Sequence, residues 1–157
     1  MRSFTLIELL VATTVILFFS GLSFAYYNNF NQEKNLKNET QKLVNTIELA
    51  KKKANSGESQ NCPSLCGYRL SVNSNSYSVD ACCSCDEVGN CVNQIPIINY
   101  PFPSNINSLN AFTTIFKPLS PLITSGSIQL KNNNINKCKQ ISINKAGIIE
   151  TQDISCP

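Results

Sequence analysis

The sequence predicts an α+β fold in which one long N-terminal helix packs on a small antiparallel β-sheet head. Three observations lead to this prediction. Positions 9–27 carry no charge, an amphipathic segment without glycine or proline covers 33–54, and short alternating segments follow Gly57. The apolar period therefore changes from three or four residues to two, which marks the passage from helix to strand. One helix followed by antiparallel strands is typical of the α+β class.

The charge-free segment is long enough to cross a membrane. Its 19 residues would span roughly 28 Å as a helix, which is close to the hydrocarbon thickness of a bilayer. Tyr26 and Tyr27 end the segment, and aromatic rings favour the membrane–water interface. Membrane lipid is therefore an expected partner of this part of the chain.

The second half of the helix carries a single apolar stripe, whose members recur every three or four residues: Leu36, Thr40, Leu43, Val44, Ile47, Ala50 and Ala54. Such a stripe predicts that this half lies against the head. The charged residues, Glu39 among them, are expected largely off the stripe. Asn55-Ser56-Gly57 supplies a stop, so we expect one continuous helix over about 4–55.

The rest of the chain has the pattern of short strands. Residues 67–72 and 77–81 alternate around a polar turn and predict a hairpin. Residues 82–106 hold four cysteines and three prolines, and we expect them to form a cross-linked loop. Four more strands are expected, at 112–116, 127–131, 140–144 and 148–151. The last two would be joined by a turn at 145–147.

All eight cysteines lie beyond the apolar segment, at Cys62, Cys66, Cys82, Cys83, Cys85, Cys91, Cys138 and Cys156. An even number placed after a membrane anchor favours disulfides in an oxidising compartment. The alternative is a thiolate metal site built from the first five, but the chain has no histidine and no pair of CxxC motifs. Eight cysteines allow about 105 pairings. Our preferred pair is Cys138–Cys156, because these two residues flank the final hairpin.

Glu8 interrupts the apolar N-terminus, and a carboxylate there requires an explanation because charge is costly inside a membrane. Two explanations are open from the residues alone. One is a positively charged amine, created if the chain is cut just before Phe4. The other is that Glu8 simply reaches the cytoplasmic interface.

The stretch SFTLIELLV at 3–11 resembles the processing site of type IV prepilins and type II secretion pseudopilins. In that family a membrane aspartyl peptidase cleaves before the phenylalanine and methylates the new amine. The resemblance implies a cut between Ser3 and Phe4, N-methylation of Phe4 and an assembly role for Glu8. One position departs from the family pattern, because Ser3 stands where glycine is usual.

The same resemblance implies a domain organisation. Residues 1–3 would be a leader peptide, 4–27 a transmembrane and assembly helix, and 28–157 a pilin-like head that begins with the helical segment 28–55. A weaker similarity, over 110–151, links the C-terminal half to the H-type minor pseudopilin and the fimbrial-assembly domain. Its matching segments are 116–118, 127–130, 141–143 and 146–149.

These resemblances imply a minor pilin or pseudopilin, a structural subunit of a type IV pilus or a type II secretion pseudopilus. Its expected partners are other pilin subunits, the prepilin peptidase and the inner-membrane assembly platform. Before assembly the chain would cross the cytoplasmic membrane once, with its head on the extracytoplasmic side. After assembly it would lie in the filament.

Two alternative functions come from other features. Lys131, Lys137 and Lys139 are candidate DNA contacts for a DNA-uptake pilin, although the net charge of +3 is mild and no arginine lies nearby. Residues 23–25, Ser-Phe-Ala, offer a small-x-small site for an ordinary signal peptidase, which would release a secreted cysteine-rich protein. Catalysis has little support, since there is no histidine, no GxSxG and no glycine-rich phosphate loop. We expect no catalytic residue, no cofactor and no resident metal.

Overall fold

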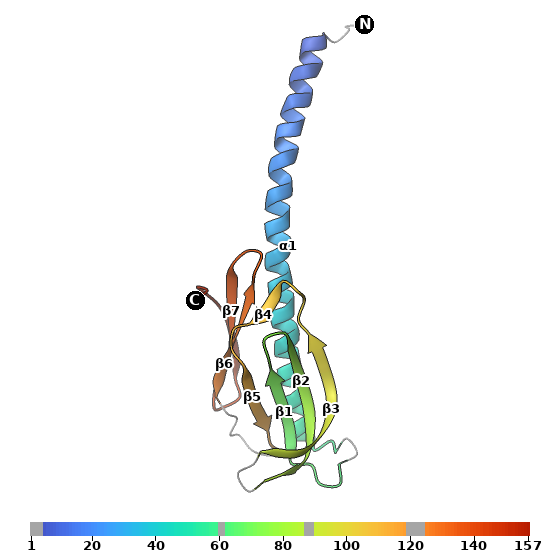
Figure 1. Ribbon diagram of the computed structural model, residues 1–157, viewed down its shortest axis with the longest axis vertical. Helices are drawn as coiled ribbons and strands as arrows, with labels where there is room; N and C mark the ends of the chain where they lie inside the picture. Colours follow the sequence, from blue (N-terminus) through green and yellow to red (C-terminus); the bar gives the residue numbers. More distant parts are fainter. Residues whose placement is uncertain (1–4, 60–61, 87–89, 119–124) are drawn as a thin grey trace.

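The computed structural model describes residues 5–59, 62–86, 90–118 and 125–157, with the backbone alone at 22–25. Among these residues a single helix, α1 (Leu6–Ser56), is followed by eight strands. Its 51 residues give a length of about 76 Å. Figure 1 shows that the N-terminal part of α1 projects from the molecule, whereas its C-terminal part lies along the strands. The predicted α+β class is confirmed.

Both ends of α1 have local causes. Thr5 is the N-cap, and its side chain accepts a hydrogen bond from the backbone N–H of Glu8. At the other end Gly57 adopts φ +65°, and its N–H donates to the carbonyl of Ala54 at 3.3 Å. Glycine is favoured at this left-handed position because it has no Cβ. The predicted single helix and its glycine stop are therefore confirmed.

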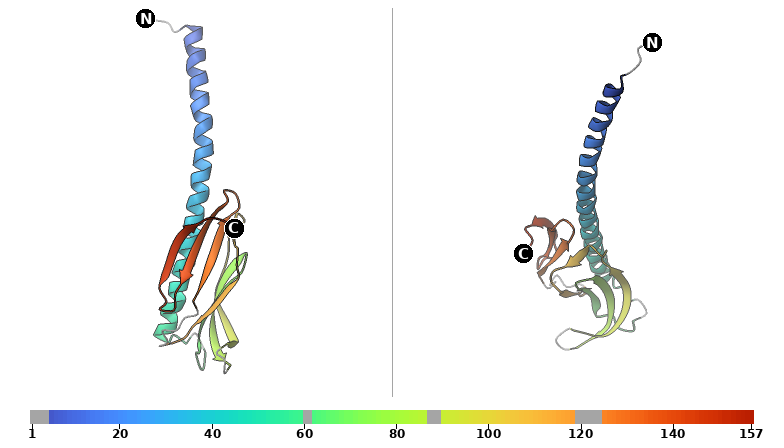
Figure 2. Two further views of the ribbon diagram at one scale, coloured as in Figure 1. Left: turned by 90° about the vertical axis from the view of Figure 1, so that its left-hand side faces the viewer. Right: turned by 45° about the horizontal axis from the view of Figure 1, so that its top comes forward.

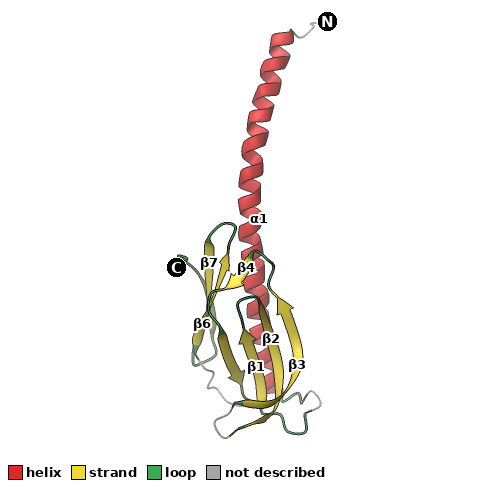
Figure 3. Ribbon diagram, viewed as in Figure 1, coloured by secondary structure: helices red, strands yellow, loops and turns green. Residues whose placement is uncertain are grey.

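The strands form two four-stranded antiparallel sheets (Figures 2 and 3). The first has the order β3-β2-β1-β5, made of β3 (Cys91–Pro101), β2 (Ser76–Cys85), β1 (Gly67–Val72) and β5 (Phe112–Phe116). The second has the order β4-β6-β7-β8, made of β4 (Ile106–Ser108), β6 (Gly126–Asn132), β7 (Lys137–Ile143) and β8 (Ile149–Ile154). The hairpins β1–β2 and β7–β8 were predicted, but the division of the strands into two sheets was not.

The prediction of a loop over 82–106 is wrong. This segment contains the end of β2, all of β3 and the start of β4. The prolines that argued against a strand, Pro96 and Pro101, lie within β3, opposite Asp80 and Ser76 of β2. Because β3 is at the edge of its sheet, it bonds to a neighbour on one side only. An edge strand tolerates proline, since the missing N–H can fall on its unpaired side.

The core lies between the C-terminal half of α1 and both sheets. All seven residues of the predicted stripe are buried. The six apolar ones belong to a cluster that also includes Tyr68, Leu70, Ile128 and Ile141. One expectation fails here: Glu39 was placed off the stripe, yet it is only 7% exposed. Its carboxylate is compensated by an ion pair with Lys42 on the next turn.

Disulfides connect all eight cysteines in four pairs: Cys62–Cys83, Cys66–Cys85, Cys82–Cys91 and Cys138–Cys156. Their Cα separations lie between 5.0 and 6.0 Å, within the range usual for a disulfide. The preferred pair, Cys138–Cys156, is confirmed, and its 18-residue separation corresponds to about 3 kcal/mol of stabilisation in the chain-entropy description. The alternative metal site would need five of these same thiols, which the structure instead pairs with one another or with Cys91.

Candidate functional site: the projecting helix and its neck

The projecting part of α1 exposes an almost continuous apolar surface. Large hydrophobic side chains on every side of this part are more than 45% exposed; they are Leu6, Ile7, Leu9, Leu10, Val11, Val15, Ile16, Leu17, Phe18, Phe19, Tyr26, Tyr27 and Phe30. By length and composition α1 is able to cross a membrane. A soluble monomer rarely leaves so large an apolar surface in water, so this surface needs a non-aqueous environment or a partner.

Three hydroxyl groups of this part, those of Thr13, Thr14 and Ser20, are satisfied within the helix itself. Thr13 donates to the carbonyl of Leu10 at 3.0 Å, and Thr14 donates to that of Val11 at 2.8 Å. Ser20 bonds the carbonyl of Ile16 in the same way at 2.8 Å. These groups can therefore enter lipid without an unpaired donor. A Cβ added at Gly21 would meet no atom of the chain within 4 Å, so packing within the subunit does not require this glycine.

Glu8 forms a capping box with Thr5 at the start of α1. Its Oε2 accepts from the backbone N of Thr5 at 3.1 Å and from the Thr5 hydroxyl at 2.9 Å, while the Glu8 N–H donates to the Thr5 hydroxyl. A carboxylate in the first turn also interacts favourably with the positive end of the helix dipole. The pattern Thr-x-x-Glu is a known sequence signal for this box, and our sequence analysis missed it.

This geometry adds a third explanation for Glu8 to the two that the residues left open. The carboxylate turns back toward the chain N-terminus and bonds the residue directly after Phe4. The predicted cleavage and methylation residues, Ser3 and Phe4, lie outside the described residues.

The three candidate DNA contacts do not share one surface. Lys131 on β6 is directly opposite Cys138 on β7, whereas Lys137 and Lys139 alternate with Cys138 along β7. Opposite residues of an antiparallel pair point to the same face, and successive residues point to opposite faces. Lys131 is thus on one face of the sheet, and Lys137 and Lys139 are on the other. Each of the latter two is already in an ion pair, with Glu33 and Asp153 respectively.

A cluster of side-chain amides joins the projecting helix to the head, at what we call the neck. Gln32 Oε1 accepts from Asn105 at 2.7 Å, and from Asn132 and Asn134 at 3.3 Å. Asn132 also donates to the backbone carbonyl of Gln32 at 3.0 Å, and it is fully buried. These bonds hold the β6–β7 turn against α1. The sequence signal was present but not used: Gln32 stands four residues before Leu36, at the start of the stripe.

No family of known proteins matches this chain, and no curated protein or solved structure is significantly similar to it. The function must therefore be argued from the residues and their geometry.

Proposed function

We propose that this chain is a minor pilin or pseudopilin, a subunit that prepilin peptidase processes and that assembles through its N-terminal helix into a type IV pilus or a type II secretion pseudopilus. The observation that carries the proposal is the coincidence of two features in one helix. The prepilin-like stretch at 3–11 leads directly into an exposed apolar half-helix, and the same helix continues into the core of a disulfide-bonded head.

Each half of the helix supplies what such a subunit needs. The exposed half can reside in lipid before assembly and among other helices afterwards, because both environments exclude water. Without a hydrophobic driving force in lipid, helices associate through close packing and buried polar pairing. Gly21 offers a place for close approach, since a Cβ added there would meet no described atom within 4 Å. The head remains folded throughout, since its core uses only the other half of α1.

Glu8 provides the polar pairing. In the subunit it caps its own helix, and this bond compensates the carboxylate during residence in the membrane. In the filament the carboxylate would face the ammonium of a neighbouring mature N-terminus. A charge left without its partner in a water-poor core is strongly unfavourable. The ion pair therefore favours the inclusion of subunits that carry both groups.

Substitutions at Glu8 test this role by separating charge from capping. Glu8→Gln keeps a side chain that can serve the capping box but removes the charge, whereas Glu8→Leu removes both. Processing and membrane insertion should survive in both variants, and the recovery of sheared filaments should fall about a hundredfold or more. Thr5→Ala is the matched control, because it removes the cap and keeps the carboxylate. Wild-type filament recovery from Glu8→Gln would contradict the assembly role.

The mature N-terminus distinguishes the proposal from the signal-peptide alternative. Intact-mass measurement of the membrane-extracted protein should give a chain that begins at Phe4 and carries one methyl group. A chain that begins at Tyr26 would instead identify the protein as an ordinary secreted one.

A further inference from the structure

We propose that the neck docks on the headgroups of anionic phospholipids while the subunit resides in the membrane. This inference rests on the membrane-anchored state in the proposed function. The surface concerned, which we call the neck face, combines aromatic, apolar and basic side chains of α1, the β6–β7 turn and the start of β7. It consists of Tyr26, Phe30, Lys34, Lys37, Ile135 and Lys137.

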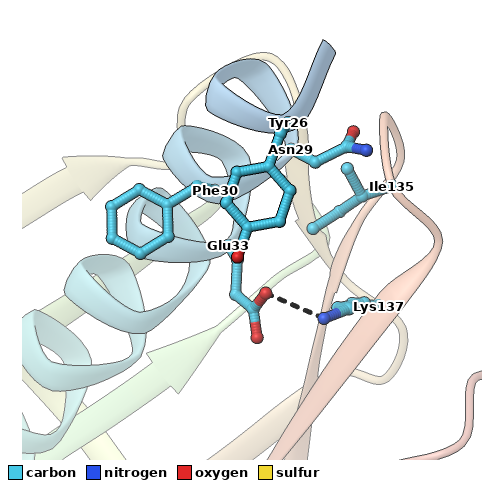
Figure 4. A pocket seen from close by; sticks show the side chains of 6 residues that line it. All are labelled: Tyr26, Asn29, Phe30, Glu33, Ile135 and Lys137. Atoms are coloured by element: carbon cyan, nitrogen blue, oxygen red, sulfur yellow. Dashed lines mark hydrogen bonds and ion pairs between the residues drawn. The ribbon is translucent and has the colours of Figure 1, made fainter. Parts of the chain in front are cut away.

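The neck face is hollowed by two adjoining pockets. The first, of about 340 Å³, is lined by Tyr26, Asn29, Phe30 and Glu33 from α1, and by Ile135 and Lys137 from the other side (Figure 4). The second, of about 480 Å³, is lined by α1 residues alone and includes Lys34 and Lys37. The two share Phe30 and Glu33. Together they give an open groove beside the helix at the place where it leaves the head.

The position of the groove along the helix matches the depth of lipid headgroups. Tyr26 and Tyr27 end the apolar span, and Phe30 and Lys34 follow Tyr26 by about 6 and 12 Å along the helix axis. The headgroup layer is roughly 5–8 Å thick on each side of the hydrocarbon. Helical side chains tilt toward the helix N-terminus, which here is the membrane side. The ammonium group of Lys34 can therefore reach back toward the phosphates. Lys37, one turn farther along α1, adds positive charge within about a Debye length of them.

The charges of the neck face favour an anion. Glu33 is the single carboxylate among the residues that line the two pockets of the neck face, and this group forms an ion pair with Lys137 at 2.8 Å. Lys34 and Lys37 are exposed, and within the described part of the chain neither has an ion-pair partner. Three lysines against one glutamate leave two net positive charges beside exposed aromatic rings. Lysine and aromatic residues are the side chains that membrane interfaces favour.

The amide cluster makes the docking depth well defined. The bonds from Asn132 and Asn134 to Gln32 hold the β6–β7 turn against α1. Ile135, within this turn, lines the same pocket as Tyr26. When α1 is anchored in a bilayer, Ile135 must therefore lie near the level of Tyr26. A lipid headgroup is favoured over another partner because the groove is continuous with the apolar span.

The chain contains no tryptophan, so Ile135→Trp introduces a single reporter of membrane depth. The full-length variant would be reconstituted in vesicles of zwitterionic lipid, with or without roughly 30% anionic phosphatidylglycerol, and with brominated lipids as quenchers. We expect stronger quenching and a blue-shifted emission in the anionic vesicles. Both effects should weaken in about 1 M salt, where the Debye length falls to about 3 Å.

Charge variants of the reporter protein identify the lysines responsible. Lys34→Gln with Lys37→Gln should lower the ratio of docked to undocked molecules about 25-fold, because each lysine near an anionic surface contributes about fivefold. The matched control is Lys52→Gln with Lys145→Gln. It removes the same charge from exposed positions, and Lys52 is about 22 Å beyond Lys37 along the helix. The control should leave the quenching unchanged.

A second measurement uses the unsubstituted protein, so its result does not depend on any effect of the Ile135→Trp side chain on the turn. Amide hydrogen exchange at 133–137 should be slower in anionic than in zwitterionic vesicles. Equal exchange and equal quenching in the two lipids, in a chain that still floats with the vesicles, would overturn lipid docking and leave the anchor intact. Quenching that depends on protein density rather than on lipid charge would assign the groove to a second subunit. A chain that fails to float would overturn both proposals.

Discussion

The two halves of α1 share one backbone and differ in where their apolar side chains lie. In residues 6–21 and 26–30 large apolar side chains lie on all sides of the helix, and they are exposed. Residues 36–54 are apolar on one stripe, and that stripe is buried. Ile16 and Ile47 make the contrast concrete, with exposures of 63% and 0%. A stripe can be buried by one partner on one side, whereas an apolar surface on all sides needs surroundings that are themselves apolar.

The two halves of this helix therefore contribute to different free energies, one to the folding of the head and the other to association with lipid or with other helices. The C-terminal half stabilises the head, because its side chains leave water when the chain folds. None of the described side chains of the N-terminal half belongs to the core cluster of the head, and their apolar surface remains available for lipid or for other helices. The following predictions test how sharply the two contributions are separated.

The largest effect is expected from a cavity in the buried half. Ile47→Ala should lower the free energy of unfolding of the head by about 2–5 kcal/mol, because it removes three buried carbon atoms from a packed core. Ile16→Ala is the matched control in the exposed half and should leave the head unchanged. Denaturant unfolding of the full chain in detergent, followed by tyrosine fluorescence, measures both. Equal losses in the two variants would contradict the separation of the halves.

A smaller effect is expected at the junction of the two halves. Asn132→Ala removes the buried amide that bonds Gln32 and should cost about 1–3 kcal/mol of the same unfolding free energy. The side chain of Asn133 is exposed on the same turn, so Asn133→Ala should change stability little. If both variants are as stable as the wild type, the amide cluster does not fasten the neck.

The smallest effect concerns pH and involves Tyr77 of β2, which interacts with Glu39 and Thr46 of the buried half. Burial raises the pKa of Tyr77, and the nearby carboxylate of Glu39 raises it further, against a lowering by the hydrogen bond with Thr46. The unfolded chain then loses this proton near pH 10, before the folded head does. Stability is therefore fully present below about pH 10 and is lost as the pH rises through the raised pKa.

Unfolding measured between about pH 8 and 11 should show this decline. The Tyr77→Phe variant, which cannot ionise at this position, should show a shallower one. Tyr68 contributes the same sign, because burial, followed by the charge of Glu58, raises the pKa of its phenol. A stability that rises with pH over this window would contradict the assignment.

Sequence reasoning succeeded where a property depends on residues that are close along the chain. The helix, its stripe and its glycine stop follow from periods of three or four residues and from one backbone conformation. The Cys138–Cys156 pair was within reach because a short hairpin brings both cysteines to the same end. The prepilin-like stretch is also a local pattern, although its cleavage position lies outside the described residues.

It failed where a property depends on a neighbour that is distant in the sequence. β3 was missed because its prolines suit a strand only at a sheet edge, and being at an edge is a relation between strands. Cys82–Cys91 joins β2 to β3, whereas Cys62–Cys83 and Cys66–Cys85 join β2 to the segment before β1. Each of these pairings depends on which segments the fold places beside β2. The burial of Glu39 depends on the residues of the head that cover that side of the helix.

The sequence by itself determined that this protein has a long helix with one all-apolar half and one striped half, followed by short strands and paired cysteines. The tertiary structure alone decided that the strands divide into two sheets, how the other six cysteines pair, and that Gln32 and Asn132 join the helix to the head. The physical reason is the range of the interactions. Helix periodicity and capping act over a few residues. Sheet order, most disulfide partners and the amide cluster depend instead on segments that the fold brings together. Gln32 and Asn132, for example, are 100 residues apart in the sequence.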